Sequence, residues 1–209
     1  MNLSVPQLQA LVQAATLAPS SHNTQPWLFR LEGSLIELLA DRTRALPVND
    51  PDDRELTISC GCALFNLRVA AAAAGLHAQV EAWPDTADTD LLARVQLSPT
   101  GAAPADAALH ASMSERRTYR ERFAATAVDP MALRSLVNAV HSEAATLALL
   151  DAAEQRLGAA ALVAEGDAML WANPSWRREL AAWMHPRRRG DGLARPALAI
   201  PVAQMVVRA

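Results

Sequence analysis

Residues 18–27 read Ala-Pro-Ser-Ser-His-Asn-Thr-Gln-Pro-Trp, and this stretch guides the interpretation of the whole chain. Residues 20–26, which we call the polar loop, gather hydroxyl and amide side chains between two apolar segments. Such side chains can hydrogen-bond the polar edge of a flat heterocycle or the hydroxyls of a sugar-like chain. Ser and Asn are also common in ordinary turns, so the composition of the loop leaves a purely structural role open.

The elements around the polar loop indicate an α+β fold. Ser4 and Gln7 form a capping box that opens a helix ahead of the loop. A longer helix is predicted to open near Pro51 and to end at Gly75, a residue that suits a helix C-terminus. The predicted strands are residues 27–31, 35–40, 79–83 and 91–97.

The chain beyond these strands is predicted to be mainly helical. Residues 98–105 are rich in Pro, Gly and Ala and are the best candidate for a linker. Asp129 and Asn173 are each followed by proline, which is typical of a capped helix start. Residues 151–171 are a predicted helix, and residues 146–150 are a short strand candidate.

The composition excludes several classes of protein and mechanism. The 209 residues are 51% hydrophobic and 20% charged, with a formal net charge of -3. This balance is unlike that of a disordered chain and gives no support to broad binding of nucleic acid. All 19 basic side chains are arginine, so neither a Schiff-base lysine nor a P-loop lysine can exist. The five histidines show no metal-binding spacing, and we expect no metal.

Cysteine usage and hydropathy indicate the compartment. Cys60 and Cys62 are too few for a disulfide framework, and we interpret them as small buried residues of an apolar helix. Residues 1–10 lack the basic and apolar regions of a signal peptide. The most apolar stretch, residues 69–75, is too short to cross a bilayer. We therefore expect a reduced, cytoplasmic protein with no membrane partner.

The run Arg116-Arg117-Thr118-Tyr119-Arg120 is a second candidate for ligand binding. Arginines four residues apart share a helix face, and a guanidinium fork binds phosphate through two parallel hydrogen bonds. Thr118 adds a hydroxyl group. The same run also suits a solvated helix end, so on its own it does not decide between the two roles.

A weak internal repeat suggests two related halves. Residues 8–12 resemble residues 133–137, an offset of 125 residues, and Arg54-Glu55-Leu56 resembles Arg178-Glu179-Leu180, an offset of 124. Alanine-rich helices can produce such matches by chance. We predict a first half of residues 1–100 and a second half of residues 101–209, packed as one globular unit with pseudo-twofold symmetry and a site between them.

Together, the polar loop and the arginine run resemble the flavin-dependent nitroreductase superfamily. Residues 18–27 are similar to its Pro-Ser-Ser to Gln-Pro-Trp signature, and residues 116–120 to its arginine-rich FMN-phosphate motif. In the family that motif normally precedes the signature, whereas here it follows. The reversed order resembles the Acg-type branch, in which two nitroreductase-like halves are fused. The resemblance covers most of residues 5–195 and implies an FMN-binding α+β fold with a central, mainly antiparallel sheet flanked by helices.

The resemblance also implies a role for each site residue. Those implied to contact the ribityl chain or ring system of FMN are Ser20, Ser21, Asn23 and Gln25. Those implied to hold the phosphate are Arg116, Arg117, Thr118 and Arg120. Trp27 is expected to pack behind the loop. The implied chemistry is hydride transfer from NAD(P)H through the flavin to a nitroaromatic- or quinone-like acceptor, with no dedicated catalytic acid or base.

Two other functions stay open at this point. One is a non-catalytic protein that binds or sequesters FMN, because the Acg-type branch often encloses its flavin under a lid. The other is a flavin-free remnant that acts through protein contacts. The chain ends at Ala209, short of a full-length fused member, so the second half is expected to be incomplete. The chain is then expected to be either a truncated or fragmentary version, or one whose fold a homodimer or a separate partner chain completes.

Overall fold

The computed structural model describes residues 3–99, 104–184, 190–193, 203–205 and 207. Two compact units make up the chain: Met1–Arg116 with Asn173–Ala209, and Arg117–Ala172. Each unit is described separately below. These units reflect packing, whereas the predicted halves, residues 1–100 and 101–209, reflect a proposed duplication. The duplication and the packing of the halves as one globular unit therefore stay predictions.

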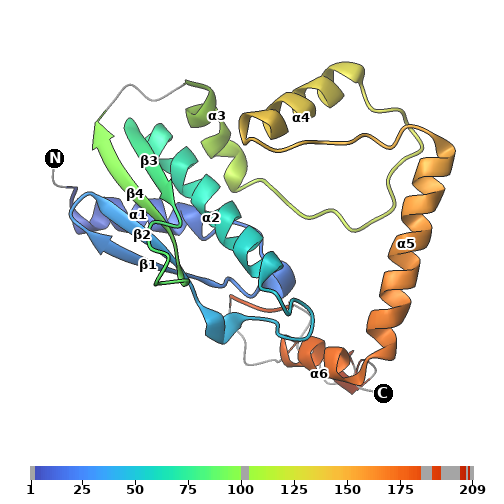
Figure 1. Ribbon diagram of the computed structural model, residues 1–209. Coiled ribbons are helices and arrows are strands. Elements are labelled where there is room, and N and C mark those ends of the chain that lie inside the picture. Colours follow the sequence, from blue (N-terminus) through green and yellow to red (C-terminus); the bar gives the residue numbers. More distant parts are fainter. Residues whose placement is uncertain (1–2, 100–103, 185–189, 194–202, 206, 208–209) are drawn as a thin grey trace. The chain divides into compact units, whose positions relative to one another are not determined.

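A four-stranded antiparallel sheet forms the centre of the first unit (Figure 1). Its strands are β1 (Trp27–Glu32), β2 (Leu35–Ala40), β3 (Leu76–Ala82) and β4 (Leu91–Pro99), in the order β1-β2-β4-β3. All four match the predicted strands to within a few residues. Gly33 has a positive φ of 60° in the tight turn between β1 and β2, a conformation that glycine adopts without strain.

Two helices cover one face of this sheet. They are α1 (Val5–Ala15), which begins with the predicted capping box, and α2 (Arg54–Ala73). Every second residue of a strand points to the same face, so the helices meet a continuous apolar surface. The buried core that results contains Leu8, Leu11, Ala15, Ile36, Leu67, Ala70, Ala71, Leu76, Val95 and Leu97. The predicted α+β class and antiparallel sheet are thus confirmed.

The other face of the sheet carries charged residues across three strands. Glu37 of β2 lies opposite Arg30 of β1 and Arg94 of β4 in the strand register. Its carboxylate accepts hydrogen bonds from Arg30 Nη1 at 2.6 Å and from Arg94 Nε at 2.9 Å. These bonds hold the pKa of Glu37 below its ordinary value, with the Arg94 bond as the largest cause.

The long helix α2 starts three residues later than predicted. Residues before Arg54 form turns, and Asp53 at the N-cap has a left-handed φ of 52°. The carboxylate of Asp50 instead accepts a hydrogen bond from the backbone N–H of Leu56 at 2.8 Å, which satisfies a donor in the first turn. By length and composition α2 is apolar enough to cross a membrane, and half of its apolar window is buried inside this unit.

Two further helices belong to the first unit, α3 (Pro104–Met113) and α6 (Pro174–Ala182). Asn173 caps α6 as predicted, because its side chain accepts hydrogen bonds from the backbone N–H groups of Ser175 and Trp176. Trp176 and Trp183 are buried and take part in packing, whereas Trp171 is 47% exposed.

The second unit contains α4 (Pro130–Ser142) and α5 (Ala153–Ala172). Asp129 caps α4 as predicted by accepting a hydrogen bond from Met131 N at 3.1 Å. Two predictions for this region are wrong. Residues 146–150 form no strand, since the second unit offers no other strand to pair with. Residues 116–120 lie between α3 and α4 outside any helix, so their arginines do not share a helix face.

Candidate functional site

The polar loop has an unusual backbone that α2 supports from behind. His22, Asn23 and Gln25 have positive φ values of 49°, 53° and 52°, a conformation that is costly for residues other than glycine. The Cys60 thiol donates a hydrogen bond to the Pro26 carbonyl at 3.2 Å and so ties the end of the loop to α2. Strained backbone of this kind persists only where the surrounding structure holds it.

Ser20 and Ser21 line a hollow of about 290 Å³ beside α2. The other residues that line it are Pro19, Glu55, Ile58, Ser59 and Cys62. The four residues from α2 lie three or four positions apart, which places them on one face of the helix. The Ser21 hydroxyl donates a hydrogen bond to Glu55 Oε2 at 2.5 Å. This half of the predicted site therefore faces an open hollow, as a ligand-binding role requires.

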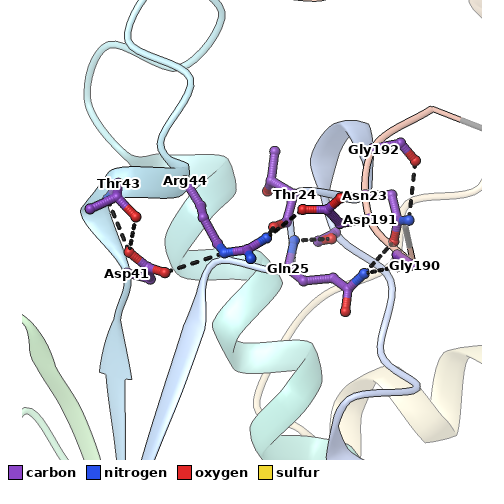
Figure 2. A network of polar contacts seen from close by, with 10 residues as sticks. Asn23, Thr24, Gln25, Asp41, Thr43, Arg44, Gly190, Asp191 and Gly192 are labelled. Carbon is purple, nitrogen blue, oxygen red and sulfur yellow. Dashed lines mark hydrogen bonds and ion pairs between the residues drawn. The ribbon is translucent and has the colours of Figure 1, made fainter. Parts of the chain in front are cut away.

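Asn23 and Gln25 are engaged elsewhere, with a distant segment of the same unit (Figure 2). Asn23 Nδ2 donates to the carbonyl of Gly192 at 3.1 Å, and the Gly192 N–H donates to the Asn23 carbonyl at 2.9 Å. Gln25 Nε2 donates to the carbonyl of Gly190. The two amide side chains predicted to contact the flavin thus hold residues 190–192 in this structure.

Arg44 strengthens this second attachment. Its guanidinium Nη1 donates to the Thr24 carbonyl at 2.9 Å and to Asp191 Oδ2 at 2.8 Å, while Nε lies 3.3 Å from Asp41 Oδ2 (Figure 2). Residues of this network line a second hollow of about 510 Å³, with Gln25 and Trp27 at its wall. Trp27 itself is buried against α2 and the sheet, which confirms that it packs behind the loop.

Arg116 lies beside the first hollow. Its Nη2 donates a hydrogen bond to the carbonyl of Leu17 at 3.3 Å, directly before the predicted signature. The guanidinium is also close enough to Cys62 to oppose the rise in the pKa of that thiol, which burial causes. Because Cys62 lines the hollow, the charge of one arginine of the predicted phosphate group acts on a residue of that hollow, although Arg116 itself is not among the lining residues.

The other predicted phosphate residues belong to the second unit. Arg117, Thr118 and Arg120 are exposed and precede α4. Their predicted contact with the phosphate of FMN, in a cleft shared with Asn23, stays a prediction.

His22 joins the polar loop to two carboxylates that carry the repeated Arg-Glu-Leu pattern. Burial lowers the pKa of His22, and the charges of Glu55 and Glu179 partly oppose this effect. Its Nδ1 is buried without a hydrogen-bond partner among the described residues. Glu179 of α6 accepts hydrogen bonds from the backbone N–H groups of Val48 and Asn49 at 3.0 and 2.9 Å.

Sequence reasoning missed the residues that support the loop. Glu55 and Glu179 were visible as equivalent positions of the internal repeat, yet nothing in the sequence indicated that both would meet Asn49. Gly190 and Gly192 lie in an arginine-rich segment of the sequence, residues 185–195, of which residues 185–189, 194 and 195 fall outside the described residues. The only available signal was the pair of glycines, each of which has a positive φ.

Comparison with known proteins gives the family. No protein-family model matches the chain. The chain is 40% identical over 126 residues to "Putative NAD(P)H nitroreductase Rv3131" and 39% identical over 118 residues to "Putative NAD(P)H nitroreductase acg", both from Mycobacterium tuberculosis. These matches cover 59% and 56% of this chain. These similarities support membership of the nitroreductase superfamily.

Sequence similarity to a relative extends along most of the chain, although the relatives are longer. An uncharacterized M. tuberculosis protein, Rv3127, is 31% identical over 198 residues, which is 92% of this chain and 57% of the relative. The chain spans only 37% and 36% of the two nitroreductase-named relatives. A solved nitroreductase family protein from Streptococcus pneumoniae matches 64% of this chain and 89% of its own, with 16% identity and a TM-score of 0.41. That likeness in shape is weak, so the assignment rests on sequence.

The first hollow fits part of a flavin mononucleotide. Hydroxyl groups of Ser20 and Ser21 suit a polyol chain, and the guanidinium of Arg116 suits a phosphate. A volume of about 290 Å³ lies at the small end of ligand sites, so the hollow would take one end of the cofactor while the rest extends through its open mouth.

Proposed function

We propose that the chain binds FMN at the hollow beside Ser20 and Ser21 and acts as an NAD(P)H-dependent oxidoreductase of the nitroreductase type. The observation that carries this proposal is the meeting of two distant motifs. Arg116 donates a hydrogen bond to the carbonyl of Leu17, directly before the family signature and 99 residues away in sequence, and its charge acts on Cys62 of the hollow. Names of relatives that share 39–40% identity support the reaction class.

In this proposal the residues of the chain bind and orient the cofactor. Arg116 pairs with the phosphate. When bound, the flavin accepts a hydride from NAD(P)H and passes reducing equivalents to a nitroaromatic- or quinone-like acceptor. We assign no catalytic acid or base to the chain.

The oligomeric state and the location remain proposals as well. No residue of α4 or α5 is buried, which supports a second copy or another chain that covers these helices. We expect the protein to work in the cytoplasm. Size-exclusion chromatography with light scattering checks the first of these two points: a monomer that stays folded would contradict it.

The test begins with the cofactor. The purified protein should carry or take up FMN, identified by its absorbance spectrum and by the mass of what it releases on denaturation. NAD(P)H oxidation should then depend on added FMN and on a quinone or nitroaromatic acceptor. Binding without turnover would replace the proposed enzyme by a protein that sequesters FMN. A chain that binds no flavin would leave only a role through protein contacts.

A further inference from the structure

Glu55 determines which hydrogen bonds the hollow can offer. It lies in the first turn of α2, and its Oε2 accepts a hydrogen bond from the Ser21 hydroxyl at 2.5 Å and from Asn49 Nδ2 at 3.2 Å. A carboxylate can only accept, so the single proton of the Ser21 hydroxyl points at Glu55. Ser21 is left with lone pairs for anything that enters the hollow.

The hydroxyl proton of Ser59 is likewise engaged in a hydrogen bond. Its hydroxyl donates to the backbone carbonyl of Glu55 at 2.7 Å. Ser20 Oγ already accepts a hydrogen bond from Gln25 N at 2.9 Å. That bond leaves the proton of the Ser20 hydroxyl able to donate, so the wall near Glu55 presents one hydroxyl donor, at Ser20, and two acceptors, the Ser21 oxygen and the carboxylate itself. Such a wall binds a group rich in O–H or N–H donors and repels a phosphate.

The opposite charge, that of Arg116, acts on a residue further along α2. Cys62, beside Arg116, follows Glu55 by seven residues, which is two turns or about 10 Å along α2 on the same face. The hollow thus has an acceptor-rich end at Glu55 and a cationic end near Cys62. A ligand with hydroxyls on one part and a phosphate on the other matches this polarity.

We propose that Glu55 is a positioning residue that fixes Ser21 as a hydrogen-bond acceptor, so that the hydroxyl-bearing chain of FMN lies at Glu55 and its phosphate at Arg116. The inference rests on the proposed function, because it concerns the orientation of the same cofactor. It adds a residue, a hydrogen-bond direction and a separate role for each end of the hollow.

Riboflavin has the polyol chain but no phosphate. Comparing its binding with that of FMN therefore distinguishes the contribution of the Glu55 end of the hollow from that of the Arg116 end. We would titrate FMN and riboflavin into the full chain and into variants, following quenching of flavin fluorescence. Ser21→Ala and Glu55→Ala should each weaken both flavins by a similar factor, on the order of tenfold. Arg116→Ala should weaken FMN by a similar factor and leave riboflavin unchanged.

The conservative variant and a matched control distinguish positioning from folding. Glu55→Gln keeps an oxygen that accepts the Ser21 proton, so it should restore riboflavin affinity to within a factor of two or so of the unmodified chain. Glu154→Ala removes the equivalent first-turn glutamate of α5 and should change neither affinity. Circular dichroism identifies any variant that fails to fold, and Ser21→Ala then carries the test.

Three results would decide against the account. If Ser21→Ala and Glu55→Ala bind both flavins as the unmodified chain does, the positioning role is wrong. If Glu55→Ala weakens FMN but spares riboflavin, the polyol lies elsewhere and the orientation is wrong. If the unmodified chain binds neither flavin, the proposed function fails first, and this inference fails with it.

Discussion

The two ends of the polar loop are held by different parts of the chain. Ser20 and Ser21 rest against α2, where Glu55 lies 34 residues from Ser21 and the hollow opens beside them. Asn23 and Gln25 instead hold Gly192 and Gly190, at separations of 169 and 165 residues. The serine end presents oxygen atoms to a hollow, while the side-chain amides at the other end donate hydrogen bonds to the backbone of the same chain.

This difference shows that one contiguous motif can have two structural roles: one end of the polar loop lines a hollow, and the other end holds residues 190–192. The first end depends on a helix that also forms the core, so it should keep its geometry even when other parts of the unit open. The second end depends on a short segment that contributes only a few hydrogen bonds. Changes to residues 190–192 should therefore affect Asn23 and Gln25 and leave the hollow beside Ser21 intact.

The largest effect is expected from Gly190→Ala. Gly190 has a φ of 83° with open space around an added Cβ, so the cost is purely conformational, about 1–2 kcal/mol. Local opening of the segment should then become roughly 5- to 30-fold more frequent. Hydrogen exchange of the Gly192 and Leu193 amides measures it, since both donate hydrogen bonds within the first unit.

A matched control is Gly166→Ala in α5, where an added Cβ also meets nothing within 4 Å but φ is not positive. This change should stabilise its helix by up to about 1 kcal/mol. If the Gly190→Ala variant loses protection from hydrogen exchange equally at the amides of Ser21 and Gly192, the two ends of the loop open together. That result would contradict their independence.

A smaller effect is expected from Asn23, where two substitutions separate side chain from backbone. Asn23→Gly removes the hydrogen bond to Gly192, at a cost of about 1 kcal/mol, and relieves the positive φ. Asn23→Ala removes the same bond but keeps the strain, so exchange at Gly192 should rise further. Identical exchange in both variants would mean that backbone strain contributes nothing to this attachment.

Elements with local causes were predictable from sequence, and long-range contacts were not. The caps at Ser4, Asp129 and Asn173 depend on neighbouring residues, and all three form. The expected helix face at residues 116–120 failed, because α3 ends at Met113 and spacing alone does not extend a helix. The strand at residues 146–150 failed because apolar composition does not supply a partner strand.

The candidate site shows the same limit. The signature implied that Ser20 and Ser21 contact a flavin; the two residues line a hollow, and the contact itself stays a prediction. The signature did not reveal Glu55, which is determined only when α2 packs against the loop. It also assigned Asn23 and Gln25 to a ligand, since no local pattern indicates that a segment more than 160 residues away meets them.

Acid should destabilise the sheet through Glu37, independently of the polar loop. The response of the sheet to pH therefore serves as a reference for changes made at either end of the loop. The depressed pKa of Glu37 means that its ion pairs stabilise the fold above the ordinary glutamate value of 4.5 and that this contribution is lost as the pH falls below it. Glu37→Gln should lower the free energy of unfolding by about 1 kcal/mol at neutral pH. It should also make the loss of stability below pH 4.5 less steep. Urea unfolding at several pH values measures both effects. If the variant loses stability in acid as steeply as the unmodified chain, groups other than Glu37 cause that loss.

The smallest effect is expected at His22, between the two ends of the loop. Burial lowers its pKa below 6.5, so the unfolded chain binds this proton more readily and stability should decline as the pH falls below that value. His22→Asn removes the titrating group, and asparagine tolerates the positive φ. The slope of unfolding free energy between pH 5 and 7 should then become shallower; a steeper slope would contradict the assigned direction.

Protection of Cys62 by FMN tests the central claim most directly. Cys62 lines the hollow, whereas Cys60 is buried, with its pKa raised to about 12, and serves as an internal reference. Alkylation at mildly alkaline pH, read by mass spectrometry, should slow at Cys62 when FMN is added and stay slow at Cys60. FMN that binds, as its quenched fluorescence shows, while Cys62 reacts at an unchanged rate would mean that the flavin lies outside the hollow.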